Sequence, residues 1–271
     1  MSTATIAPAP PRLSADEQAA YARDGIVIPR ARLSPAAVDR LREALDRLLA
    51  ENPDRRPEQL VNAHLRKGPE GVRGNDVFLD MAQDPAIVDL VAGLVGPDVI
   101  LWGCQVFCKP GGDGMEVPWH QDGHYWPIRP LATTTAWIAI DDSTTENGCM
   151  RVIPGSHRGG LLPHAKAPRD RVVLDLEVDA GAYDESTARD VVLEAGQLSL
   201  HDVYLIHGSR PNRSPRRRAG LAIRYMPATS QFDRTVAPMT SYGTAVIDFS
   251  RRPIWLVRGV DRAGNDFAVG H

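Results

Sequence analysis

The first hundred residues show hydrophobic positions at helical spacing. Ser14 begins a helical segment as an N-cap, Glu17 follows three residues later as in a capping box, and Gly25 ends the segment. A second helix begins after Ser34, which precedes Pro35 at the first helical position. One face of this helix is apolar and predicts packing against a core; it carries Val38, Leu41, Leu45, Leu48 and Leu49. A short strand is expected over 26–28 and a further helix over 85–97.

After residue 98 the pattern changes to short β-prone runs separated by turn sequences such as PGGDG, ENG and EAG. The expected strands cover 98–107, 133–140, 172–178, 191–193, 197–207 and 220–226. Many short strands with regular turns predict an all-β barrel or sandwich, with the helices as an outer layer.

Composition excludes several classes of protein. The chain has 271 residues, 43% of them hydrophobic, which suits one domain with a large core. A formal net charge of −3 gives no general attraction to nucleic acid or anionic membranes, and no apolar run spans a bilayer. The three cysteines form no CxxC pair and the start does not resemble a signal peptide, so a cytoplasmic protein is expected. We expect a monomer or homodimer with a small-molecule substrate.

The segment WHQDGHYWPIRP, residues 119–130, contains an HxD pair, His120 and Asp122. On a strand, residues two apart point to the same face, so these side chains could hold adjacent positions on a metal. His207, at the end of the expected strand 197–207, is the best candidate for a third ligand. Two histidines and one carboxylate form the facial triad of non-haem Fe(II) oxygenases, although an isolated HxD pair is also common at surfaces.

Arg218 follows His207 by eleven residues and leads into an apolar strand. Its guanidinium offers a planar fork for a carboxylate, which a dicarboxylic cosubstrate beside the iron would require. The other arginines of the run are expected to be solvated turn residues; they are Arg210, Arg213, Arg216 and Arg217.

Four motif stretches follow one another in order along the chain: KPGG (109–112), WHQDGHYWPIRP (119–130), AWIAIDDSTTENGCMRVIPGSHRGG (136–160) and HGSRPNRSPRRR (207–218). In these stretches taken together, the chain resembles the phytanoyl-CoA dioxygenase family of Fe(II)- and 2-oxoglutarate-dependent oxygenases. The resemblance implies a mainly β fold, a cupin-like double-stranded β-helix or jelly roll with flanking N-terminal α-helices. The Ala- and Pro-rich start predicts a flexible tail at 1–12, followed by a single oxygenase domain at 13–271. The change of pattern along the chain divides this domain into a mainly helical part (13–97), a jelly-roll core (98–226) and a C-terminal extension (227–271).

The same resemblance implies the site residues and cofactors. Iron would be held by His120, Asp122 and His207, and the distal carboxylate of 2-oxoglutarate by Arg218 with Ser209 beside it. Lys109 and Trp137 match positions that line the cosubstrate pocket of the family. The chain departs from related oxygenases after the arginine, where Ala219-Gly220 replaces the usual x-Ser.

The expected reaction consumes Fe(II)-bound 2-oxoglutarate and O2, releases succinate and CO2, and hydroxylates an unactivated C–H bond of a small organic substrate. Asp122 disfavours a halogenase, in which a small residue replaces the carboxylate. Desaturation, cyclisation or epimerisation of a natural-product intermediate would use the same residues and stays open. A non-catalytic jelly-roll binding module and a zinc hydrolase are further alternatives.

Four residues near the HxD pair are candidates for substrate contacts. Arg129 offers a charge for an anionic group, and His124, Tyr125 and Trp126 follow the metal motif. A structural role in the loop is an equal alternative for the last three.

Overall fold

The computed structural model describes residues 12–167, 170, 172–241 and 245–271. The tail expected over 1–12 lies outside the described residues except for Arg12. The α-helices are α1 (Ala15–Asp24), α2 (Pro35–Glu51), α3 (Asp76–Ala82) and α4 (Pro85–Val95). Short 3₁₀ helices are η1 (Pro57–Gln59), η2 (Asp122–His124), η3 (Ser156–Gly159), η4 (Ala180–Ala182) and η5 (Glu185–Thr187).

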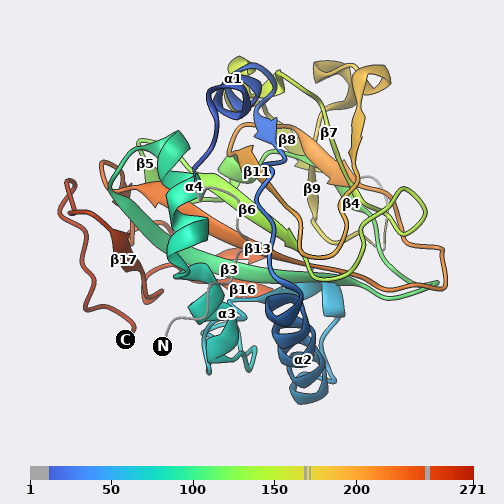
Figure 1. The fold of residues 1–271 in the computed structure, drawn as a ribbon, viewed down its shortest axis with the longest axis horizontal. Helices are drawn as coiled ribbons and strands as arrows, with labels where there is room; N and C mark the ends of the chain where they lie inside the picture. Colours follow the sequence, from blue (N-terminus) through green and yellow to red (C-terminus); the bar gives the residue numbers. More distant parts are fainter. Residues whose placement is uncertain (1–11, 168–169, 171, 242–244) are drawn as a thin grey trace.

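Two sheets form the centre of the molecule (Figure 1). The larger sheet has the order β1-β11-β6-β13-β3-β17, and β2 also pairs with β3. Its strands are β1 (Ile26–Val27), β2 (Leu60–Val61), β3 (Val99–Lys109), β6 (Thr134–Ala139), β11 (Leu198–Asp202), β13 (Arg218–Pro227) and β17 (Trp255–Arg258). The smaller sheet has the order β10-β7-β12-β4, with β4 (Val117–His120), β7 (Met150–Val152), β10 (Arg189–Val191) and β12 (His207–Ser209).

Three two-stranded sheets complete the described part of the chain. They pair β5 (Ile128–Arg129) with β14 (Gln231–Phe232), β8 (His164–Lys166) with β9 (Leu176–Val178), and β15 (Met239–Ser241) with β16 (Ala245–Ile247). The chain passes repeatedly between the two main sheets, and this confirms the predicted jelly roll with flanking helices.

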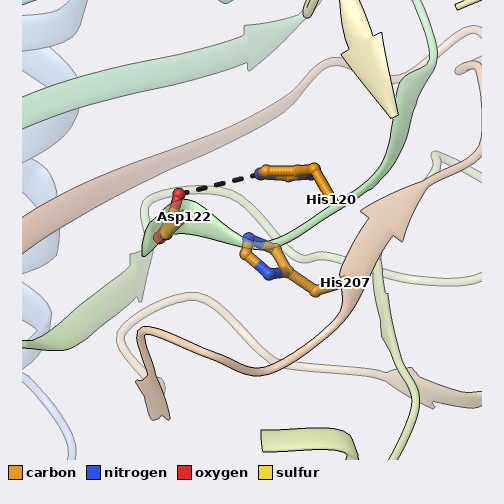
Figure 2. Close-up of side chains that lie close together, drawn as sticks. All are labelled: His120, Asp122 and His207. Atoms are coloured by element: carbon orange, nitrogen blue, oxygen red, sulfur yellow. Dashed lines mark ion pairs between the residues drawn. The ribbon is translucent and has the colours of Figure 1, made fainter. Parts of the chain in front are cut away.

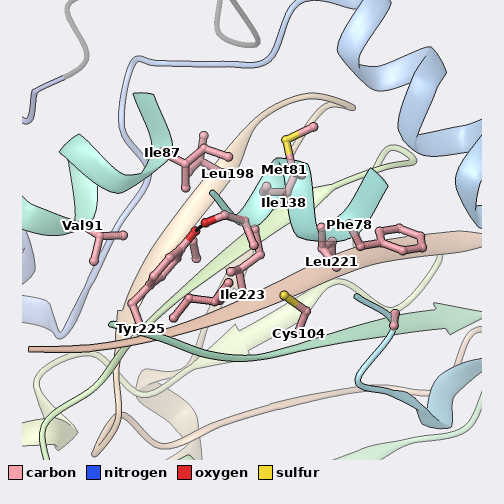
Figure 3. Close-up of a cluster of buried hydrophobic side chains, with 14 of the residues drawn as sticks. Phe78, Met81, Ile87, Val91, Cys104, Ile138, Leu198, Leu221, Ile223 and Tyr225 are labelled. Atoms are coloured by element: carbon pink, nitrogen blue, oxygen red, sulfur yellow. Dashed lines mark hydrogen bonds between the residues drawn. The ribbon is translucent and has the colours of Figure 1, made fainter. Parts of the chain in front are cut away.

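The main core lies between the larger sheet and the helices. Alternation along β13 sends Leu221, Ile223 and Tyr225 to this side, where they meet Phe78 and Met81 of α3 (Figure 3). Tyr225 donates a hydrogen bond from its hydroxyl to the carbonyl oxygen of Ala82 at 2.8 Å. The helices therefore cover one face of the larger sheet and leave its other face to the jelly-roll interior.

The expected strand over 197–207 is wrong in one respect that matters for the site. It divides into β11 and β12, which belong to different sheets. Asp202 makes the turn between them: its carbonyl accepts from the Leu205 amide at 3.1 Å and its side chain from the Tyr204 amide at 2.8 Å. His207 thus begins a strand rather than ending one.

Smaller differences concern strand ends. Only Leu176–Val178 of the expected strand 172–178 forms β9, and the strand expected at 191–193 lies at Arg189–Val191. Helix α3 was not predicted from the sequence. The C-terminal segment adds β17 to the edge of the larger sheet, where Leu256 pairs with Ile100. No helix in the described ranges has both the length and the apolar character needed to cross a membrane.

Candidate metal centre

His120, Asp122 and His207 lie close together, with their side chains converging (Figure 2). His120 is the last residue of β4, Asp122 begins the 3₁₀ helix η2, and His207 is the first residue of β12. His120 and His207 are direct partners across the two antiparallel strands. The chain turns immediately after His120, so strand alternation does not bring Asp122 to the site; the 3₁₀ turn does.

The three side chains are close enough to share one ion. One ligand atom from each lies within 4.8 Å of the others. His120 Nε2 is 3.7 Å from Asp122 Oδ1, and the two imidazole centroids are 4.1 Å apart. All three residues are buried, so water competes weakly for the positions that they surround.

Backbone carbonyls orient both imidazoles. His120 Nδ1 lies 2.9 Å from the carbonyl oxygen of Pro118, and His207 Nδ1 lies 2.9 Å from that of Leu205. A proton on Nδ1 donates to the carbonyl and leaves the Nε2 lone pair for a metal. Each ligand histidine is therefore held by the residue two positions before it.

The protonation states suit a cation. Burial by itself raises the pKa of Asp122, but interactions with His120 and His201 and the charges nearby hold this pKa well below its usual range. Burial, together with the neighbouring His120, holds the pKa of His207 well below its usual value. A carboxylate and neutral imidazoles are the forms that bind metal, so the residues present fit a divalent ion.

His201 is a residue of the site that sequence reasoning missed. Its Nε2 lies 3.7 Å from Asp122 Oδ2, and its ring centroid lies 4.9 Å from that of His207. It contacts the carboxylate on the side away from His120. The alternation in β11 was an available signal, since Leu198 and Leu200 face the helices and His201 must then face the interior.

A first cavity joins His120, Asp122 and His207 to Arg218; its lining also includes Trp137, Ser209 and Met150. Arg218 is buried, and its Nε and Nη2 donate to the carbonyl oxygen of Gly148 at 3.1 and 2.8 Å. Nη2 also lies 3.4 Å from Ser209 Oγ. Within the described part of the chain these bonds leave Nη1 available, so the guanidinium keeps donors for a carboxylate.

The charge of Arg218 survives its burial. Burial lowers the pKa of Arg218 to about 10, so the guanidinium remains protonated at neutral pH. The guanidinium carbon lies 5.5 Å from the centre of the Trp137 ring, within cation–π range. Arg218 and Trp137 therefore form one wall of the first cavity.

The structure gives a physical reason for glycine at position 220. A Cβ atom there would lie 2.0 Å from Cζ2 of Trp137. The indole occupies the space that a side chain at 220 would need, so the departure from x-Ser accompanies the placement of Trp137. The hydroxyl near Arg218 comes instead from Ser209 on β12.

Lys109 and Arg129 do not line the first cavity, nor the second cavity that is described below. Lys109 is buried, and its ammonium donates to the carbonyl oxygens of Ser209 and Arg210. Burial and the charge of Arg218 hold its pKa well below the usual value. Arg129 is exposed and donates to the carbonyl oxygens of Trp126 and Ile128.

The other candidate substrate residues divide between two places. Tyr125 and Trp126 line a second cavity, which also reaches His120 and Asp122. His124 stacks on His164 with the ring centroids 4.2 Å apart, and His164 accepts the amide hydrogen bond of Gln121 at 3.0 Å. His124 lines neither the first nor the second cavity, because its ring packs against His164.

Comparison with known proteins identifies the family. The family described as Phytanoyl-CoA dioxygenase (PhyH) matches residues 21–220. A probable phytanoyl-CoA dioxygenase of Caenorhabditis elegans is 27% identical over 91% of this chain and 92% of its own. An L-proline trans-4-hydroxylase of Streptomyces griseoviridis is 29% identical over 82% and 90%.

A solved structure supports the cofactors. CytC3 with Fe(II) and alpha-ketoglutarate superposes with a TM-score of 0.65 and 26% identity, covering 94% of this chain and 93% of that one. Its fold agrees with the jelly roll described above, and 2-oxoglutarate is the same compound as alpha-ketoglutarate. From the family match, the relatives and the shared fold, the chain belongs to the phytanoyl-CoA dioxygenase family and is an Fe(II)- and 2-oxoglutarate-dependent oxygenase.

Proposed function

We propose that this protein hydroxylates an unactivated C–H bond of a small organic substrate, with iron bound by His120, Asp122 and His207. The observation that carries the proposal is the convergence of the three ligand atoms within 4.8 Å in a cavity that ends at Arg218. Three protein ligands on one face leave positions for cosubstrate and O2. Bound Fe(II) and 2-oxoglutarate supply the oxidising chemistry, with succinate and CO2 as products.

The protein's own residues bind, orient and exclude water. We assign the distal carboxylate of 2-oxoglutarate to Arg218, with Ser209 beside it and Trp137 along the cavity wall. Buried donors at fixed positions fit a carboxylate better than mobile surface lysines, because little ordering is needed on binding. His201 is assigned to Asp122, where it keeps the carboxylate oriented and ionised.

The test uses anaerobic absorption spectroscopy of Fe(II)-loaded protein before and after addition of 2-oxoglutarate. A visible charge-transfer band that needs both components is expected in the wild type. Arg218→Ala should raise the 2-oxoglutarate concentration needed for the band by at least about tenfold, since a charge-assisted pair contributes roughly 1.5–3 kcal/mol. Arg213→Ala removes an exposed charge from the same segment and should leave the band unchanged.

Two outcomes would contradict the proposal. Absence of the band in wild-type protein that has bound Fe(II) would show that 2-oxoglutarate does not chelate the iron. Turnover that persists without 2-oxoglutarate would favour a zinc hydrolase built on the same ligands.

For its setting, we propose a cytoplasmic enzyme that acts as a monomer or homodimer, without a nucleic-acid or membrane partner. Cys104, Cys108 and Cys149 are buried free thiols, which suits a reducing compartment. Light scattering of the purified chain tests the assembly.

A further inference from the structure

Arg224 is a buried cation on the interior face of β13, at the other end of that face from Arg218. It is 9% exposed and lines both cavities. Its guanidinium carbon lies 5.1 Å from the centre of the Trp126 ring and 5.7 Å from that of Trp102. The side chain is therefore held in an aromatic cage beside the metal centre.

The hydrogen bonds of Arg224 leave its charge uncompensated. Nη2 donates to Gln105 Oε1 at 2.9 Å, and Nε is buried without a hydrogen-bond partner among the residues that the structure describes. Gln105 is neutral, so this bond orients the guanidinium without cancelling its charge. A buried charge with no carboxylate in ion-pair contact loses hydration free energy, and a bound anion would offset that loss.

Arg252 in the same cavity shows the contrast. Its Nη2 lies 2.6 Å from Glu70 Oε1, and both side chains are buried. Asn62 donates to the second oxygen of Glu70 at 2.6 Å. The protein therefore supplies a carboxylate for one buried arginine of the second cavity, and in the described residues it supplies none in ion-pair contact with Arg224.

The second cavity has a suitable shape and lining for an organic anion. It reaches His120 and Asp122, so a molecule bound in it lies next to the metal centre. Its apolar wall comes from Val61, Phe107, Trp126, Leu174, Ile247 and Phe249. The helical part, the jelly roll and the C-terminal extension thus all contribute to it.

Charge balance selects a monoanion. In the proposed complex, the charges of Fe(II), Asp122, doubly ionised 2-oxoglutarate and Arg218 sum to zero. Burial, together with the charges of Arg252 and Arg224, lowers the pKa of His64 to about 3, so this histidine adds no positive charge at neutral pH. One negative charge then neutralises Arg224, whereas a phosphate dianion would leave an excess charge in a buried site.

We propose that Arg224 is the substrate-recognition residue of this oxygenase and that the primary substrate is a monocarboxylate with an apolar body. The carboxylate binds the guanidinium in the second cavity, and the body lies along the apolar wall toward the metal. The position of the oxidised carbon next to the metal rests on the proposed function. The anion site itself is inferred from the geometry around Arg224 alone.

The test measures binding by calorimetry to anaerobic protein loaded with Fe(II) and saturated with 2-oxoglutarate, which occupies the Arg218 site. The probes are hexanoate and hexanamide, which share an apolar tail and differ in charge. Wild type should bind hexanoate at least about tenfold more tightly than hexanamide, because a charge-assisted bond is involved. Hexyl phosphate should bind more weakly than hexanoate.

Variants identify the residue responsible. Arg224→Gln should remove the preference for hexanoate, and Arg224→Lys should keep part of it because the charge remains while the fork is lost. Arg213 is an exposed arginine of the turn between β12 and β13, and Arg213→Gln should bind both probes like wild type. The Fe(II)–2-oxoglutarate absorption band reports whether each variant is folded around the metal.

Equal affinity of wild type for the two probes would overturn the proposal, even if Arg224→Gln fails to fold. A hexanoate preference that survives in folded Arg224→Gln would also overturn it. These results are separable from the proposed function, which fails if the wild-type absorption band is absent. Hexanoate bound through Arg224 without such a band would leave an anion site in a protein with a different activity.

Discussion

The two faces of β13 are built from alternate residues of one strand and serve different purposes. Leu221, Ile223 and Tyr225 face the helices and pack in the main core. Arg218 and Arg224 face the interior and line the cavities around the metal ligands. The apolar face gains stability by leaving water, while each arginine on the other face loses hydration that a ligand can replace. We infer that one face stabilises the fold and the other binds ligands.

The largest effect is expected from His207→Ala, which removes a ligand on the interior side. Without one of three protein ligands, iron binding fails, and 2-oxoglutarate turnover should fall by more than about 1,000-fold, equivalent to roughly 4 kcal/mol. Iron content and succinate release measure it. The free energy of unfolding of the metal-free protein should change little; a variant that kept both iron and turnover would refute the assigned ligand set.

Ile223→Ala tests the opposite face. This side chain is fully buried, so its truncation should lower the free energy of unfolding by about 2–5 kcal/mol. The folded fraction should still form the Fe(II)–2-oxoglutarate absorption band. Denaturant unfolding measures the loss, and Val192→Ala, at an exposed position, should cost less than about 0.5 kcal/mol. Loss of the band with unchanged stability would mean that the two faces are not separate in function.

Gly220→Ser adds a side chain to the interior face where Trp137 lies. The new Cβ would stand 2.0 Å from the indole, so the ring must move and the cavity wall beside Arg218 changes. We expect the KM for 2-oxoglutarate to rise about tenfold, a change of about 1.4 kcal/mol. Gly159→Ser is the matched control, because nothing lies within 4 Å of a Cβ there. An unchanged KM would separate Trp137 from cosubstrate binding.

The smallest effect is a pH dependence from His64, which is buried with its ring against that of Trp255. Burial, followed by the charges of Arg252 and Arg224, lowers the pKa of His64 to about 3. The pKa of a histidine in the unfolded chain is about 6.5. Below this pH the unfolded chain binds a proton at His64 that the native state does not bind, so the free energy of unfolding falls as pH falls. Between pH 6.5 and 5.5 this contributes a loss of about 1 kcal/mol.

The measurement for this last prediction compares denaturant unfolding of wild type and His64→Leu at the two pH values. The variant should lose about 1 kcal/mol less than wild type over the interval. Identical pH dependence in both proteins would show that His64 is accessible to protons in the native state. Water would then reach His64, unlike the side chains on the apolar face of β13.

The sequence predicted most of the core and the convergence of three side chains for a definite physical reason. Alternation and helical spacing are local properties, and they indicated helix α2, the strands β3, β6 and β13, and an all-β barrel or sandwich, while the family resemblance indicated the jelly roll. Motif spacing likewise selected His120, Asp122 and His207, which the structure brings together. The mistake at 197–207 arose because a continuous β-prone run contains no local signal for a change of sheet; Asp202 makes that turn.

Tertiary structure alone decided which other polar residues reach the site. Arg129 follows the metal motif closely in sequence, yet it lies exposed on β5. Arg224 belongs to no sequence motif, yet it is buried and lines the same cavity as His120, Asp122 and His207. His201, on β11 of the larger sheet, reaches Asp122, which follows β4 of the smaller sheet, only because the two sheets lie together in the fold. An arginine can bind a ligand carboxylate only if no carboxylate of the protein already pairs with it. Glu70 pairs with Arg252 in this way. Such neighbours come from segments far apart in the chain. Periodicity and motif spacing therefore predict strands and candidate ligands, whereas burial and charge pairing are properties of the assembled fold.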